Sequence, residues 1–279
     1  MNSLQHGDRN QDVCDLQRAL TKAGFKVADD GYFGDSTESA VRAYQARKGL
    51  VADGIAGPKT IATINGVEAP GLLSQAALAV GAQRLGVELA AILAVNEVES
   101  QGAGFLPNGK PKILYERHIM YRQLQVTRST QDDASELKAR ADKLCVAQPN
   151  LVNTAPGGYS GGTAEHQRLA NAKLIDETSA LESASWGAFQ IMGFHAVRLG
   201  YPSVQAFAGL MAQDENEQFE AFIRFIEADP ALLKALRGKK WAAFAKAYNG
   251  PDYLRNLYDT KLERAYDRHA SASAVEVAA

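Results

Sequence analysis

The chain has few cysteines and no long apolar run. Its 279 residues include two cysteines, Cys14 and Cys145, which lie far apart and match no metal-binding spacing. The first residues, MNSLQHGDRNQDV, are polar and lack the apolar core of a signal peptide. Glutamine, arginine, glycine and glutamate interrupt the most apolar region, residues 72–98, so it predicts two helices and not a membrane span. We therefore expect synthesis in the cytoplasm, no membrane anchor and no disulfide framework.

Strong net charge and the common catalytic motifs are also absent. The formal net charge is −2, with 46% hydrophobic and 22% charged residues, which favours an ordinary globular protein without nucleic acid as a partner. The sequence has no phosphate-binding loop of the GxxxxGKS or GxxxxGKT type and no HExxH motif, and its 5 histidines share no spacing. Neither a Ser-His-Asp nor a Cys-His signature is visible. We expect neither a metal nor a cofactor.

Residues 1–66 predict a three-helix module. Apolar residues recur at helical spacing in 4–20, and two later helices each follow a turn. The two turns, DGYFGDST and DGIAGPKT, echo each other: Asp-Gly, two residues, Gly, and Thr three further on. Asn-Gly and Pro-Gly then end the module, and residues 67–71 form a short linker.

This pattern resembles the peptidoglycan-binding domain found at the ends of many cell-wall hydrolases. The resemblance is carried by Gly7, Val13, Leu16, Gln17, Leu20, Asp30, Gly31, Phe33, Gly34, Thr37, Ala40, Val41, Gln45, Leu50, Asp53, Gly54, Gly57 and Thr60. It implies that the module binds bacterial peptidoglycan. Tyr32, Tyr44 and Arg47 are candidates for lining a glycan or peptide groove.

Residues 72–265 predict a second, helical domain. Phe219, Phe222, Ile223 and Ile226 follow the helical pattern, and KPKILYERH is the one segment that suits an extended strand. PGGYSGG, residues 156–162, is too rich in glycine for a helix or a strand. The final residues, 266–279, have little to bury and predict a frayed tail. The expected fold class is mainly α, with a small β element.

Carboxylates remain as the candidates for chemistry. In AAILAVNEVESQGAGF an apolar helix ends in Glu97 and Glu99, and Gly102 and Gly104 stop it. The negative end of the helix dipole and an apolar wall both raise the pKa of a carboxyl, and a protonated carboxyl is what a general acid needs. Helical periodicity alone cannot choose between the two glutamates. Two ordinary surface acids at a solvated helix end are the alternative.

Two later segments select one of these acids by resemblance. SWGAFQIMG predicts a polar-aromatic turn running into a short helix, and AYNG ends another helix. Together with Glu-Ser at 99–100, they resemble the lysozyme superfamily, in particular goose-type lysozymes and lytic transglycosylases. The N-acetylmuramidase domain of modular phage endolysins is a closer match, through ESQGAGF, ILYERH and SASWGAFQIMGFH. That resemblance implies a lysozyme-like fold, the acid at Glu99 and a second acidic position at Glu116.

The resemblance implies a glycoside hydrolase that cleaves β-1,4 bonds between N-acetylmuramic acid and N-acetylglucosamine. Glu99 donates the proton, and Glu116 acts either as a base for water or as a stabiliser of the oxocarbenium ion. A structural salt bridge to Arg117 or to another base is the other reading of Glu116. Gln190, Tyr248 and Asn249 are candidates for binding the sugar, with loop scaffolding as the alternative for Gln190 and Asn249.

Two other functions stay open at this point. A lytic transglycosylase would use the muramic 6-hydroxyl in place of water and would form 1,6-anhydro products. A non-catalytic protein would only bind the wall, which the two intact glutamates argue against. The expected role is that of a monomeric, bacteriolytic phage endolysin, held in the host cytoplasm until a holin releases it to the peptidoglycan. A virion-associated or bacterial wall enzyme is the alternative origin.

Overall fold

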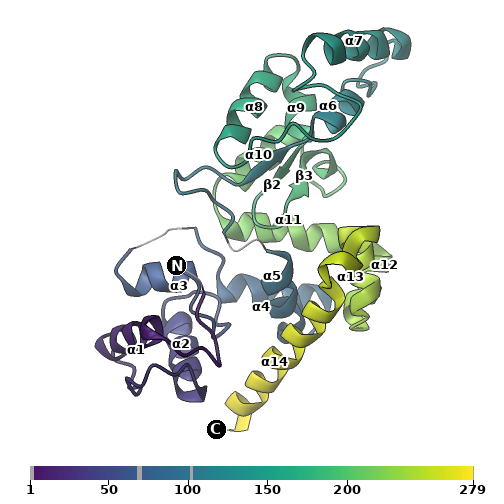
Figure 1. Cartoon of the computed structure of the whole chain (residues 1–279). Helices are drawn as coiled ribbons and strands as arrows, with labels where there is room; N and C mark the ends of the chain where they lie inside the picture. Colours follow the sequence, from purple (N-terminus) through teal and green to yellow (C-terminus); the bar gives the residue numbers. More distant parts are fainter. Residues whose placement is uncertain (1–2, 68–70, 101–102, 279) are drawn as a thin grey trace. The chain divides into compact units, whose positions relative to one another are not determined.

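Fourteen α-helices and one small antiparallel sheet form the computed structural model, which describes residues 3–67, 71–100 and 103–278 (Figure 1). The predicted mainly α fold with a small β element is confirmed. The chain divides into two compact units, unit 1 (Met1–Val98 with Ala231–Ala279) and unit 2 (Glu99–Pro230). The predicted helix stop at Gly102 and the linker residues 68–70 lie outside the described residues.

The first part of unit 1 contains the three predicted helices. They are α1 (Gln11–Lys22), α2 (Asp35–Arg47) and α3 (Pro58–Ile64). The side chain of Asn10 caps α1 by accepting from Val13 N at 3.0 Å, and Pro58 occupies the first turn of α3, where its missing N–H costs nothing. The shared core consists of Leu4, Val13, Leu16, Leu20, Phe33, Ala40, Val41, Tyr44 and Ala56. Tyr44 is therefore a core residue, and its predicted place in a ligand groove is wrong.

A buried glutamine explains the first of the two echoed turns. Gln17 of α1 is 1% exposed. Its amide nitrogen lies 2.9 Å from Asp30 Oδ1 and 3.0 Å from Thr37 Oγ1. Its amide oxygen accepts from the backbone N–H groups of Asp30 and Gly31. One side chain thus holds the Asp-Gly of the turn and the threonine that follows it.

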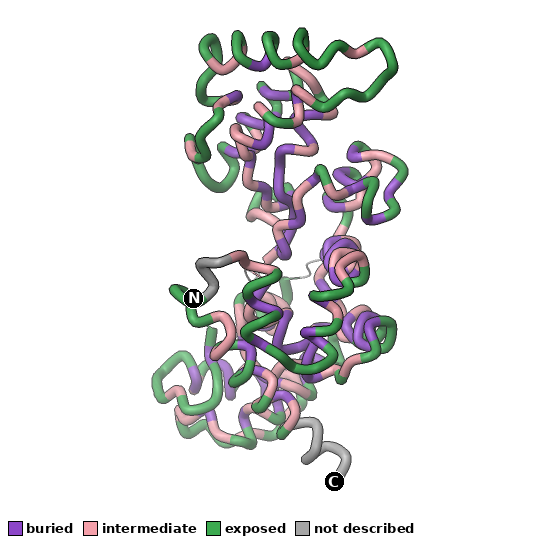
Figure 2. The backbone as a smooth tube through the Cα atoms, turned by 90° about the vertical axis from the view of Figure 1, so that its right-hand side faces the viewer, coloured by how far each residue is buried: buried purple, intermediate pink, exposed green. Residues whose placement is uncertain are grey.

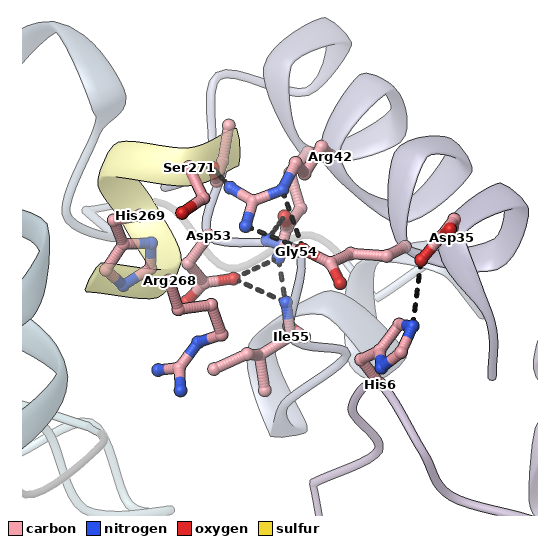
Figure 3. A network of polar contacts seen from close by, with 12 residues as sticks. His6, Asp35, Arg42, Asp53, Gly54, Ile55, Arg268, His269 and Ser271 are labelled. Atoms are coloured by element: carbon pink, nitrogen blue, oxygen red, sulfur yellow. Dashed lines mark hydrogen bonds and ion pairs between the residues drawn. The ribbon is translucent and has the colours of Figure 1, made fainter. Parts of the chain in front are cut away.

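Gln45 of α2 repeats this arrangement at the second turn. Its nitrogen lies 2.8 Å from Asp53 Oδ1 and 3.0 Å from Thr60 Oγ1, and its oxygen accepts from Gly54 N at 2.9 Å. Figure 3 shows this turn, in which Asp53 also accepts from Ile55 N. Each turn is organised by a glutamine of the preceding helix, because a primary amide offers donors and an acceptor together.

The rest of unit 1 is helical. It contains α4 (Gln75–Leu85), α5 (Leu89–Glu99), α12 (Pro230–Arg237), α13 (Trp241–Asn249), a 3-10 turn at Pro251–Asn256 and α14 (Tyr258–Ala278). Gly86 ends α4 in the left-handed region at φ 65, and Arg237 Nε donates to Leu85 O at 2.7 Å. Within the described residues no single helix has the length and apolar character to cross a membrane; α4 and α5 pass that test only as a pair bent by 115°.

The end of the chain differs from the expected frayed tail at 266–279. Helix α14 continues through it, and Leu262 and Ala265 are buried. Arg268 and His269 contact Glu97 of α5, the imidazole at 2.9 Å and the guanidinium at 2.5 Å. Figure 3 shows both α14 side chains beside the turn at Asp53. Small residues favour a tail here, whereas the side chains of Arg268 and His269 contact the Glu97 carboxylate.

Unit 2 contains the sheet and the remaining helices. The sheet has β1 (Ile113–Tyr115), β2 (Ala184–Trp186) and β3 (Ile191–Met192) in antiparallel order, with Leu114 opposite Ser185 and Trp186 opposite Ile191. The helices are α6 (Arg117–Gln123), α7 (Ala134–Ala147), α8 (Ala164–Lys173), α9 (Glu177–Glu182), α10 (Val204–Met211) and α11 (Glu215–Glu227). Figure 2 shows α7 as a largely exposed helix.

The segment SWGAFQIMG forms a β-hairpin, which corrects the predicted turn into a short helix. Strands β2 and β3 enclose the loop 187–190, and only a 3-10 turn at Gly193–His195 follows. Phe189 at the loop is 3% exposed and stacks on Phe222 of α11, with ring centroids 4.5 Å apart. Trp186 is 5% exposed, so both aromatics are packing residues.

Replacing Gln17 with leucine tests the role of the buried amide. We expect Gln17→Leu to lower the free energy of unfolding by about 3 kcal/mol, because the buried groups of the turn lose their partners. Gln11→Leu is the matched control on the same helix, at an exposed side chain that donates only to Asp15, and should change stability by less than about 0.5 kcal/mol. Urea unfolding followed by circular dichroism measures both, and equal midpoints would contradict the assignment.

Candidate active site

Glu99 is the last residue of α5 and is 8% exposed. The preceding turns of this helix bury Ile92, Leu93 and Val95. Glu99 is therefore a buried carboxyl at the negative end of an apolar helix, which is the position that the sequence indicates.

Glu97 behaves differently from the expectation of a raised pKa at this helix end. Burial alone raises the pKa of Glu97, but hydrogen bonds and charge from His269 and Arg268 outweigh it and hold the pKa below its ordinary value. Glu97 is thus an ionised structural acid.

A short backbone path runs from the acid to the second carboxylate. Lys112 N donates to Gly104 O and Leu106 N donates to Lys110 O, each at 2.8 Å, so residues 104–112 fold back on themselves before β1 begins. Strand β1 then ends at Tyr115, and Glu116 N donates to Ser183 O at 2.8 Å. Glu116 therefore lies between β1 and α6, whereas the sequence predicts it on the strand itself.

Helix α11 holds the start of this path and the loop of the hairpin between β2 and β3. Glu215 Oε1 accepts from Gly104 N at 2.7 Å, and Gln218 Oε1 accepts from Ala188 N at 2.8 Å. A Cβ at Gly187, whose φ is +74, would lie 2.5 Å from the Gln218 amide, and a Cβ at Gly104 would overlap the same group. Only glycine leaves room at either position for the buried Gln218.

The carboxylate of Glu116 is partly exposed, at 15% of its side chain. Tyr159 Oη donates to it and lies 2.8 Å from Oε2 and 3.1 Å from Oε1. His118 Nδ1 lies 3.1 Å from Oε2, a distance that suits an ion pair when the ring is protonated, although the ring is not turned for a hydrogen bond. Arg117, the first partner that the salt-bridge alternative names, donates to backbone carbonyls, and His118 is the neighbouring base at this carboxylate.

Arg117 holds the loop that precedes Tyr159. Its guanidinium donates to the carbonyl oxygens of Pro149, Ala155 and Pro156, at 3.1, 3.0 and 2.9 Å. The guanidinium has five donors in a rigid fork, and here they are directed to backbone carbonyls. The arginine next to Glu116 therefore shapes the loop and leaves the carboxylate to Tyr159 and His118.

Glu165 holds the other side of the same loop. It is completely buried and accepts from Ser160 N and Gly161 N through Oε1, at 2.6 and 3.0 Å. Its second oxygen accepts from Tyr115 N at 3.1 Å and from Arg168 at 2.7 Å. Burial raises the pKa of Glu165, but these donors outweigh it and hold the pKa below its ordinary value.

Gln190 has a local role in the hairpin. Ser185 Oγ donates to its amide oxygen at 2.7 Å, and its amide nitrogen donates to Gly187 O at 2.8 Å. Its φ of 51 lies in the left-handed region, which is strained for a residue with a Cβ. These contacts match the scaffolding alternative, and sugar binding by Gln190 stays a prediction.

Tyr248 and Asn249 end α13 in unit 1, while Glu99, Glu116 and Gln190 belong to unit 2. Tyr248 stacks on Phe244, with ring centroids 6.0 Å apart and an interplanar angle of 10°. Gly250 follows at φ 78, which ends the helix. The sugar-binding roles of Tyr248 and Asn249 stay predictions.

Sequence reasoning missed the groups that support these carboxylates. Tyr159 carried one signal, as a single aromatic residue inside the glycine-rich loop 156–162. Glu165 and Arg168 carried another, as opposite charges three residues apart on a helix. Neither signal shows that these side chains hold the site. Glu165 and Arg168, for example, are placed by contacts with Tyr115, about fifty positions away in the chain.

Comparison with known proteins adds independent findings. A family model described as N-acetylmuramidase matches residues 88–270, and one described as putative peptidoglycan binding domain matches residues 9–64. The crystal structure of a Burkholderia AP3 phage endolysin is 53% identical, with a TM-score of 0.89, and the match covers 98% of this chain and 100% of that chain.

Two curated proteins are similar over a shorter stretch. A spore cortex-lytic enzyme of Halalkalibacterium halodurans is 46% identical over 57 residues, which is 20% of this chain. The N-acetylmuramoyl-L-alanine amidase CwlM of Mycobacterium tuberculosis is 44% identical over 54 residues, or 19% of this chain. The matched stretch spans only 17% and 13% of these two proteins.

Replacing Glu165 with glutamine tests the buried ion pair. We expect Glu165→Gln to lower the free energy of unfolding by about 3 kcal/mol, because the charge of Arg168 stays buried without its counter-ion. The lowered pKa means that this stabilisation is present above the ordinary value of 4.5 and is lost as the pH falls below it. The difference from the native chain should therefore shrink in acid.

Glu177→Gln is the matched control. Glu177 forms an exposed pair with Lys173 at 2.8 Å, so its loss should change stability by less than about 1 kcal/mol. Denaturant unfolding at pH 7 and at pH 3.5 measures both variants. Similar losses for the two, or a Glu165→Gln effect that grows in acid, would contradict the assignment.

Proposed function

Since the chain belongs to the N-acetylmuramidase family, we propose that it hydrolyses the β-1,4 bond between N-acetylmuramic acid and N-acetylglucosamine in bacterial peptidoglycan. The observation that carries the proposal is Glu99, a buried carboxyl at the end of an apolar helix. Glu116 supports it as a second, partly exposed carboxylate of the same unit. Acid catalysis at a glycosidic oxygen needs a group of the first kind, and activation of water suits the second.

The proposed reaction uses one proton donor and one water molecule. Glu99 gives its proton to the oxygen that leaves C1 of the muramic sugar, and the C1–O bond breaks. Water adds to C1 and loses a proton to Glu116, so the sum of the two transfers leaves one proton less on Glu99 and one more on Glu116. Proton exchange with solvent then resets both groups. Gln190, Tyr248 and Asn249 are proposed to hydrogen-bond the sugars.

The module at residues 1–66 is proposed to hold the enzyme on its substrate. Its support is the match to a putative peptidoglycan binding domain at residues 9–64. We propose that the chain is organised as this module, a linker at 67–71 and a catalytic domain at 72–265. We also propose that the protein acts as a monomeric endolysin, which waits in the host cytoplasm and reaches the wall after release by a holin, in keeping with the endolysin that it resembles.

Replacing Glu99 with glutamine tests the acid. Glu99→Gln keeps the size of the side chain and removes the proton donor, so we expect turnover to fall by at least about 1,000-fold. Glu97→Gln is the matched control on the same helix. It should lower stability, because it breaks the contacts with Arg268 and His269, and should keep activity within about tenfold. Assays on purified peptidoglycan, with circular dichroism alongside, separate the two effects. Near-normal activity of Glu99→Gln would disprove its role.

The products distinguish hydrolysis from transglycosylation. We expect mass spectrometry of released muropeptides to find hydrated muramic reducing ends, because water is the proposed nucleophile. Anhydro-muramic ends would instead show attack by the muramic 6-hydroxyl. If the native chain releases no muropeptides, the result would favour a protein that only binds the wall.

Replacing Glu116 with glutamine tests the base. The variant keeps a hydrogen-bond acceptor for Tyr159 but cannot take a proton from water. We expect turnover to fall by about 100-fold, less than for the acid, because water retains some reactivity at an oxocarbenium-like centre. The same muropeptide assay measures it. Unchanged turnover would remove Glu116 from the proposed mechanism.

A further inference from the structure

We propose that Tyr159 is a positioning residue for Glu116, and that the loop 149–162 exists to direct its hydroxyl onto that carboxylate. The inference rests on the proposed function of Glu116 and deepens it. Its basis is a set of contacts in unit 2: the Tyr159 hydroxyl donates to Glu116, and the loop backbone is held before and after Tyr159. Neither the sequence resemblance nor the family match assigns this residue a role.

The contact between the two side chains fixes the carboxylate plane. Tyr159 Oη lies 2.8 and 3.1 Å from the two oxygens of Glu116, so one O–H group faces both. His118 Nδ1 approaches Oε2 at 3.1 Å. A carboxylate held on these sides keeps the lone pairs on its remaining side for water.

The loop itself has little intrinsic preference for this arrangement. Gly157, Gly158, Gly161 and Gly162 all have positive φ, and they flank Tyr159 on both sides. Such a loop has many accessible conformations and loses a large conformational entropy when it is ordered. Its order must come from contacts outside the loop.

Buried charges supply these contacts. Glu165 binds the backbone directly after Tyr159, at Ser160 and Gly161, and Arg117 binds Ala155 and Pro156 before it. Burying the Glu165 and Arg168 charges is costly unless every donor and acceptor is paired, so a purely structural loop gains little from them. Fixing the direction of one side chain near a reacting carboxylate is a reason to keep them.

The protonation state of the phenol suits this role. Burial and the hydrogen bond to Glu116 raise the pKa of Tyr159, so the hydroxyl stays a donor across the neutral range. It can orient Glu116 but does not compete with it for the proton of water. The rival role is a stacking platform for sugar. In that role the ring of Tyr159 would contact the substrate and its hydroxyl would be dispensable.

A double-mutant cycle tests the positioning role. We compare the native chain, Tyr159→Phe, Glu116→Gln and the double variant, with kcat and KM measured on soluble peptidoglycan strands. Tyr159→Phe should lower kcat by about tenfold and leave KM within about twofold, because a hydrogen bond to a charged group is lost while the ring remains. In the Glu116→Gln background the same change should lower kcat by less than about twofold, because the oriented base is already gone.

Tyr121→Phe is the matched control. Tyr121 donates to a carboxylate oxygen of Asp142 at 2.7 Å, elsewhere in unit 2, and losing that bond should leave kcat within about twofold. A readout without catalysis accompanies the kinetics: nuclear magnetic resonance of tyrosine Cζ, assigned with Tyr159→Phe, follows the phenol titration. Glu116→Gln should lower the pKa of Tyr159.

The outcomes separate this proposal from the base assignment. Unchanged kcat in Glu116→Gln overturns both. If Glu116→Gln lowers kcat and Tyr159→Phe lowers it by the same factor in both backgrounds, the positioning role alone is overturned. A Tyr159→Phe change in KM only would also overturn it, because that result would indicate a sugar contact. An unchanged Tyr159 titration in Glu116→Gln also overturns it.

Discussion

The buried ion pair between Glu165 and Arg168 is the interaction on which the rest of unit 2 depends. Removing both charges from water is costly, and the hydrogen bonds to the pair offset that cost, although the buried Arg168 Nε has no partner among the described residues. Glu165 accepts four hydrogen bonds, from three backbone N–H groups and from Arg168. Arg168 in turn donates to Tyr115 O and Asn150 O. The pair therefore joins the end of β1, helix α8 and the loop that carries Tyr159.

The elements with a local cause could be predicted from the sequence. Helix α11 follows the apolar spacing of Phe219, Phe222 and Ile226, all of them buried. The echoed turns of unit 1 also carry their cause nearby, since Gln17 and Gln45 reach only eight to twenty positions along the chain. In both cases the pattern and the contact that explains it lie within one short stretch.

The elements that were predicted wrongly have distant causes. The hairpin at 184–192 depends on Gln218, which binds Ala188 from thirty positions away, and on a left-handed Gln190 that no propensity favours. A second distant contact lies in α14, where His269 contacts Glu97 from 172 positions away. Residue types in these segments are ambiguous, and tertiary contacts decide between the alternatives. The acid itself was found only by resemblance, since helical periodicity treats Glu97 and Glu99 alike.

The contacts of each glutamate carboxylate distinguish the structural glutamates from the proposed base. Glu165 has every lone pair engaged, and Glu97 contacts the Arg268 guanidinium and the His269 imidazole. These contacts hold the pKa of both carboxyls below the ordinary value and give them a structural task. Glu116 instead receives a neutral phenol and an imidazole on one side and keeps 15% of its side chain exposed. A base for water needs this intermediate condition: enough contacts to fix its orientation, and enough free surface to accept a proton. Glu97 is more exposed, at 28% of its side chain, but the contacts that lower its pKa make it a weaker base, so Glu116 suits this role best of the three.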